Sequence, residues 1–90
     1  MNFKEQKNAL LHLYHYFKKE HGFNIFSMNY GPFQPIDYKI LSEISEKIIE
    51  QGMKVEEEHT NNKFYQFLIA MHHIMEDKDY YKKLKTIHVD

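Results

Sequence analysis

The sequence predicts a single α+β domain that is predominantly helical, and three observations support this fold class. Residues 3–20 and 36–51 carry apolar side chains at helical spacing. Residues 53–69 can be divided into two short strands around a turn. The chain of 90 residues is 42% hydrophobic, which suits one small core. We therefore expect residues 1–90 to form one compact domain, and an all-α bundle of three or four helices is the alternative.

The first predicted helix, residues 3–20, has a narrow apolar stripe. Lys18 and Lys19 complement the negative end of its dipole, and Gly22 is a plausible stop. His12 and His15 point away from the stripe, and we expect them to face water. The stripe consists of Phe3, Leu10, Leu13, Tyr14 and Phe17.

An extended segment and a rigid turn are expected to follow. Residues 23–28 resemble a short strand. Pro32 fixes its own φ and biases Gly31 toward an extended conformation. Tyr30 and Phe33 flank this Gly-Pro pair, and we predict that at least one ring is buried against the second helix.

The second predicted helix is one continuous segment, capped by Asp37 and ended by Gly52. Ser42 and Ser45 would lie in its middle, exposed to solvent. Its apolar side would consist of Ile40, Leu41, Ile44 and Ile48. Its acidic side would consist of Glu43, Glu46 and Glu50.

The second half of the chain is ambiguous over residues 53–69. The favoured interpretation is a β-hairpin whose turn contains Asn61 and Asn62. The competing interpretation starts a helix at one of these asparagines and continues it to Met75. Residues 70–85 are helical in both cases, and residues 86–90 form a tail or a short terminal strand.

The order helix, extended segment, helix, hairpin resembles a winged-helix module. A second resemblance, to the Panacea antitoxin domain, spans Leu10 to Leu41 and includes the Tyr-Gly-Pro turn. Members of that family tend to bind and neutralise proteins of mobile elements, so the resemblance implies a protein-binding regulator. The residues that carry it are Leu10, Leu11, Leu13, Tyr14, Phe26, Tyr30, Gly31, Pro32, Pro35 and Tyr38.

Composition argues against several functions. The net charge is −1, so the overall charge does not favour binding to nucleic acid. All 12 basic residues are lysines, so the chain has no arginine to make paired hydrogen bonds with a phosphate or a base. No apolar run approaches the roughly 20 residues of a membrane helix. The chain has no cysteine, no glycine-rich phosphate loop and no nucleophile motif. We therefore expect a cytoplasmic protein that is not an enzyme and needs no cofactor.

Histidines were weighed as metal ligands. His12 and His15 are three residues apart, and His72 and Glu76 are four apart on one predicted helix. Neither pair belongs to a known metal-binding signature. We therefore expect solvated histidines and no metal site.

The predicted functional surface is acidic and edged by aromatic rings. Such a surface would steer association with another protein, such as a basic nucleic-acid-binding one. The alternative from a different functional class is a winged-helix DNA-binding transcriptional regulator, and a homodimer that places two basic patches on one duplex would favour it. The expected partner-binding residues are Glu43, Glu46, Glu50, Glu56, Glu57, Glu58, Tyr30 and Phe33.

Overall fold

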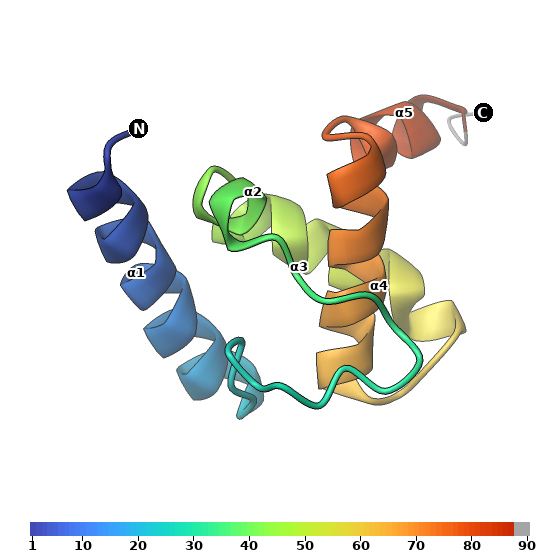
Figure 1. Ribbon diagram of the computed structural model, residues 1–90. Helices are drawn as coiled ribbons and strands as arrows, with labels where there is room; N and C mark the ends of the chain where they lie inside the picture. Colours follow the sequence, from blue (N-terminus) through green and yellow to red (C-terminus); the bar gives the residue numbers. More distant parts are fainter. Residues whose placement is uncertain (88–90) are drawn as a thin grey trace.

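The computed structural model describes residues 1–87 and shows an all-α protein over that range (Figure 1). These residues form no strand, so the α+β, winged-helix-like prediction is wrong and the helical-bundle alternative is the better description. The elements are α1 (Phe3–His21), α2 (Tyr38–Ser42), α3 (Glu46–Val55), the 3-10 turn η1 (Glu56–Glu58), α4 (Lys63–Glu76) and α5 (Tyr80–Ile87).

Helix α1 agrees with its predicted range. Asn2 caps it by accepting a hydrogen bond from the Glu5 N–H, and Gly22 ends it in the left-handed conformation at φ 76°. Leu13 and Phe17 are buried as expected. Phe3 was placed in the same stripe, but its side chain is 81% exposed because nothing packs against the first turn of α1 at that position.

The connection between α1 and α2 contains no strand at residues 23–28. Ile25 is fully buried and anchors this loop to the core. Gly31 has φ 59°, a left-handed value instead of the expected extended conformation, and the Phe33 N–H donates to the Tyr30 carbonyl to close the turn.

The predicted helix 36–51 is two helices. Asp37 caps α2 as expected, but the helix ends at Ser42, and Ser45 caps α3 by accepting from the Ile48 N–H. A serine oxygen can satisfy the first N–H groups of a new helix, which favours the break. Ser42 is buried and donates to the Lys39 carbonyl, so neither serine has its predicted mid-helix role.

The break also changes which face of α3 is buried. Ile48, assigned to the apolar side of a continuous helix, is 41% exposed. Ile49 and Met53 are buried instead. Gly52 does not end the helix, which continues to Val55; it lies inside α3 beside Ala70 of α4.

The hairpin predicted for residues 53–69 is wrong, and the competing helical interpretation is confirmed. Asn62 caps α4, its Oδ1 accepting from the Tyr65 N–H at 3.0 Å. Apolar residues at helical spacing follow this cap and are buried, so burial stabilises a helix here. Helix α5 includes Thr86 and Ile87, so these are not a tail; residues 88–90 lie outside the described range.

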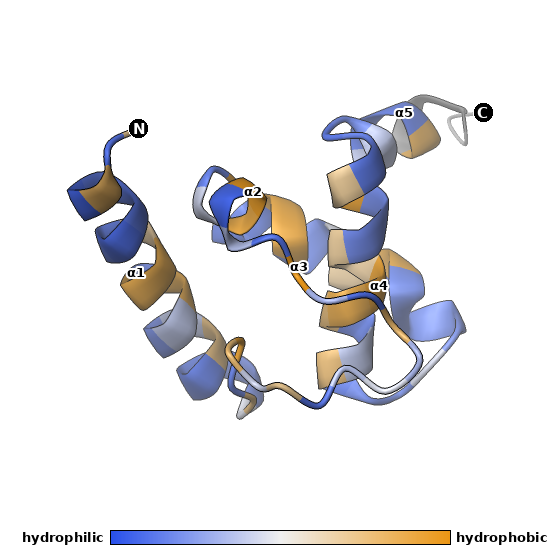
Figure 2. Cartoon of the chain, viewed as in Figure 1, coloured by the Kyte–Doolittle hydropathy of each residue, from blue (hydrophilic) through white to orange (hydrophobic). Residues whose placement is uncertain are grey.

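The core lies between α1, α3 and α4 (Figure 1). Figure 2 shows the hydrophobic side of α1 turned toward the other helices. Phe17 of α1 lies 5.6 Å from Phe67 of α4, and Phe23 of the loop lies within 5.5 Å of Phe17, Phe64 and Phe67, centroid to centroid. This aromatic cluster fixes α1 against α4.

Candidate functional site

Two of the predicted acidic residues face α1 and not a free surface. Glu46 Oε2 lies 3.3 Å from His12 Nε2. Glu50 Oε1 lies 2.5 Å from His21 Nε2, and its Oε2 accepts from the Tyr16 hydroxyl at 3.2 Å. The carboxylates of α3 therefore attach it to α1.

Three further predicted residues lie on separate parts of the surface. Glu43 Oε2 lies 3.4 Å from Lys78 Nζ, and Glu57 Oε1 lies 3.7 Å from Lys63 Nζ. Glu58 is exposed at the end of η1. Two of the six expected carboxylates therefore pair with lysines, which offset their charge.

The predicted aromatic edge supports the loop before α2. The Tyr30 hydroxyl lies 3.1 Å from the Tyr38 hydroxyl, and the Phe33 ring packs edge-on against Tyr65 at 5.3 Å. Both rings are half-buried. Their recorded ring and hydroxyl contacts are with these tyrosines, and the continuous apolar face on which they were expected to lie does not exist.

Glu56 is the predicted residue with the most unusual environment. It is 3% exposed, and its Oε2 accepts a hydrogen bond of 2.8 Å from the Tyr81 hydroxyl. Among the side chains of residues 1–84, none donates a hydrogen bond to its Oε1. Burial, and then the hydrogen bond to Glu56, raises the pKa of Tyr81, so this hydroxyl keeps its proton.

Two histidines flank this carboxylate. His59 Nε2 lies 3.9 Å from Glu56 Oε1, and His73 Nε2 lies 4.0 Å from Oε2. Both distances exceed a hydrogen bond, which leaves room beside the carboxylate. The His73 ring is held by Tyr80, which stacks on it at 4.3 Å with an interplanar angle of 4°.

These groups line an open cavity of about 500 Å³, which we call the Glu56 pocket. It lies where α3, η1, α4 and α5 meet, and no lysine among residues 1–84, the range over which side chains are described, lines it. Its charged groups are carboxylates and its walls are aromatic and aliphatic, so the pocket offers a negative, partly dry site for a cation. The lining residues are Gln51, Val55, Glu56, Glu58, His59, His73, Tyr80, Tyr81 and Leu84.

Sequence reasoning identified Glu56 and Glu58 but missed the other side of the pocket. Tyr81 belongs to the predicted helix over residues 70–85, and it is buried. Its hydroxyl, however, reaches a residue 25 positions earlier. The signal available in the sequence was the adjacent pair Tyr80-Tyr81. In the structure the planes of these two rings are nearly perpendicular, at an interplanar angle of 86°.

Comparisons with protein-family models, curated protein sequences and solved structures find no match for this chain. The Panacea resemblance is therefore neither supported nor opposed by a relative. No helix among residues 1–87 is long and apolar enough to cross a membrane.

Proposed function

We propose that this protein is a non-enzymatic regulator that binds another protein by receiving a lysine or arginine side chain in the Glu56 pocket. One observation carries the proposal: a carboxylate that is 3% exposed lines an open pocket that holds no lysine from residues 1–84. A buried charge is costly unless it is paired. A cationic side chain from a partner would supply that pairing.

The walls of the pocket suit such a side chain. The Tyr80 and Tyr81 rings offer aromatic surface for a cation, and Leu84 and Val55 offer apolar contacts for its aliphatic stem. Glu58 adds a second carboxylate to the lining. The preferred partner is therefore a basic protein, and the inhibitor or antitoxin type is the class we favour.

DNA binding through a winged helix is not retained, because the helices of residues 1–87 leave no wing. The carboxylates of the pocket would also repel phosphate. In a gel-shift assay at about 150 mM salt, we expect no specific DNA complex; a tight complex that weakens steeply with salt would contradict the proposal.

The main test uses a matched pair of variants. Glu56→Gln keeps the shape and the hydrogen bond from Tyr81 but removes the charge, and Glu57→Gln removes an adjacent, exposed charge. Each tagged variant and the parent would be used to recover partners from host extract, followed by mass spectrometry. The recovered partner would then be purified and its affinity measured against all three proteins.

We expect the parent and Glu57→Gln to bind the same basic protein, and Glu56→Gln to bind it at least tenfold more weakly. Neutralising one lysine or arginine of the partner should have a similar effect, and its effect should disappear in the Glu56→Gln background. Equal binding by Glu56→Gln and Glu57→Gln would overturn the proposal.

A further inference from the structure

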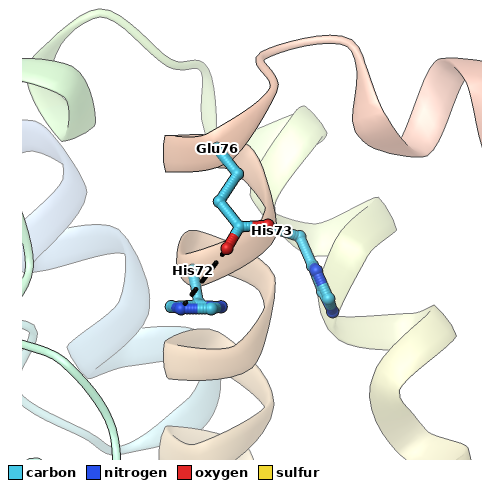
Figure 3. Close-up of side chains that lie close together, drawn as sticks. All are labelled: His72, His73 and Glu76. Carbon is cyan, nitrogen blue, oxygen red and sulfur yellow. Dashed lines mark ion pairs between the residues drawn. The ribbon is translucent and has the colours of Figure 1, made fainter.

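Three metal-ligating side chains gather on the last turns of α4, apart from the carboxylate that defines the Glu56 pocket. His72, His73 and Glu76 each offer one ligand atom, and these atoms all lie within 4.8 Å of one another. His72 Nε2 lies 3.7 Å from Glu76 Oε1. Figure 3 shows the two imidazoles on either side of the helix surface, with the Glu76 carboxylate between them.

Helix geometry explains why one carboxylate reaches both rings. Residues three and four positions apart are neighbours on a helix surface, and Glu76 is four positions after His72 and three after His73. The side chains of adjacent residues in a helix normally point about 100° apart around the helix axis. The Glu76 carboxylate therefore lies within 4.8 Å of a ring nitrogen of each histidine.

The donor set defines the class of ion. Two imidazoles and one carboxylate suit Zn²⁺, Co²⁺ or Ni²⁺, whereas Mg²⁺ and Ca²⁺ prefer oxygen ligands. Metal–ligand bonds of about 2.0–2.2 Å require the ligand atoms to approach one another more closely than they do here. Glu76 is exposed and His72 is half-exposed, so rotation of these two side chains can supply the difference.

His73 is the most restrained of the three ligands. Tyr80 stacks on its ring, and its Nε2 lies 4.0 Å from the Glu56 carboxylate. The stacking limits rotation of the imidazole, and the nearby carboxylate adds negative charge beside it. Nearby cations are occupied elsewhere: Lys78 pairs with Glu43, and Lys83 pairs with Asp77. These two lysines therefore repel a bound metal ion less than unpaired lysines would.

We propose that His72, His73 and Glu76 form a surface site for one divalent transition-metal ion, with the remaining coordination positions open to water or to a further ligand. The sequence offered His12 with His15, and His72 and His73 before Glu76, as candidate ligands and predicted no metal site; the proposal departs from that prediction because the structure groups His72, His73 and Glu76. This proposal does not depend on the proposed function.

The test titrates the untagged full-length protein with CoCl₂, followed by the visible absorption of Co²⁺, and with ZnCl₂, followed by calorimetry. The test variants are His72→Ala and Glu76→Gln, both at partly or fully exposed positions. The control is His12→Ala combined with His15→Ala, which removes two exposed histidines three positions apart on α1. Circular dichroism checks that each variant is folded.

We expect the parent and the α1 control to bind one ion per chain with equal affinity. Each α4 variant should bind at least tenfold more weakly, and should change the Co²⁺ spectrum by loss of a ligand. Binding should weaken as pH falls, because protons compete for imidazoles. The proposal is overturned if the parent binds no ion, or if the α1 control loses as much affinity as the α4 variants.

Discussion

Gly52 of α3 approaches Ala70 of α4 so closely that a Cβ added to Gly52 would lie 3.0 Å from the Ala70 Cβ. The same atom would lie 2.7 Å from Cε2 of Tyr81. Real Cβ atoms do not tolerate such distances, so a side chain here forces α3, α4 and α5 apart. Glycine is therefore required by close packing inside a helix and not by a helix end.

Gly52→Ala is expected to destabilise the protein by up to about 2 kcal/mol. Overpacking of this kind costs about 1–3 kcal/mol, and the better helix propensity of alanine returns about 1 kcal/mol. Thermal melting measures the difference, with Gln51→Ala, an exposed position on the same helix, as the control. A Gly52→Ala protein that melts at or above the parent temperature would show that the helices separate without cost.

Tyr81→Phe is expected to cost about 1–3 kcal/mol, because it leaves the buried Glu56 carboxylate without its hydrogen bond at Oε2. Urea unfolding measures this cost. Tyr80→Phe is the matched control, since the Tyr80 ring stacks on His73 and its hydroxyl makes no hydrogen bond with the side chains of residues 1–84. Equal losses in the two variants would mean that the Tyr81–Glu56 bond does not stabilise the fold.

Tyr81→Phe is also expected to make the stability of the protein less sensitive to alkaline pH. Burial, followed by the Glu56 hydrogen bond, raises the pKa of Tyr81 above its ordinary value of about 10. The stability associated with its neutral form is therefore complete below pH of about 10 and is lost as pH rises further. Melting curves from about pH 8 to 11 should fall more steeply for the parent than for Tyr81→Phe; parallel curves would contradict this cause.

Glu50→Lys is expected to destabilise the protein by about 1–3 kcal/mol, because it removes the partner of His21 and Tyr16 and places a cation beside them. Glu57→Lys is the control. It breaks only an exposed pair with Lys63, so its effect should stay below about 1 kcal/mol. Chemical unfolding of both variants gives the comparison, and a Glu57→Lys loss equal to that of Glu50→Lys would refute the role of Glu50 between α1 and α3.

Gly31→Ala is expected to lose about 2 kcal/mol for two reasons. A left-handed φ of 59° costs a non-glycine residue about 1–2 kcal/mol, and the new Cβ would lie 2.9 Å from the Tyr65 hydroxyl. Tyr65→Phe removes that oxygen, so the double variant should lose less than the sum of the single ones. If the losses of the two single variants in thermal melting add up to the loss of the double variant, the whole cost of Gly31→Ala comes from the backbone conformation and none from the contact with Tyr65.

Local signals predicted the parts of the fold that depend on neighbouring residues. Asp37 and Gly22 were recognised as the caps that they are. Ser45 has the same chemistry as Asp37, but it was overlooked because a regular apolar spacing runs across it. That spacing then misplaced Ile48 and Ile49, since a break in a helix changes the direction of every later side chain.

The site was predicted only in part for a different reason. The acidic residues were identified by their charge, but the partners that separate them come from distant positions: His12, His21 and Lys78. Only packing determines which carboxylate receives a partner and which is buried. Glu56 and Glu57 are adjacent in sequence, yet one is buried beside Tyr81 and the other is exposed.

The central position of α4 also determines how the molecule opens. Its residues Phe67, Ala70, Met71 and Ile74 are fully buried, and it packs against α3, η1 and α5 while Phe67 reaches α1. Its amide protons should therefore exchange with deuterium only when the whole domain unfolds, whereas those of the five-residue α2 exchange through local opening. The slowest-exchanging unit thus lies in the second half of the chain, and the short α2 can open while that unit stays folded.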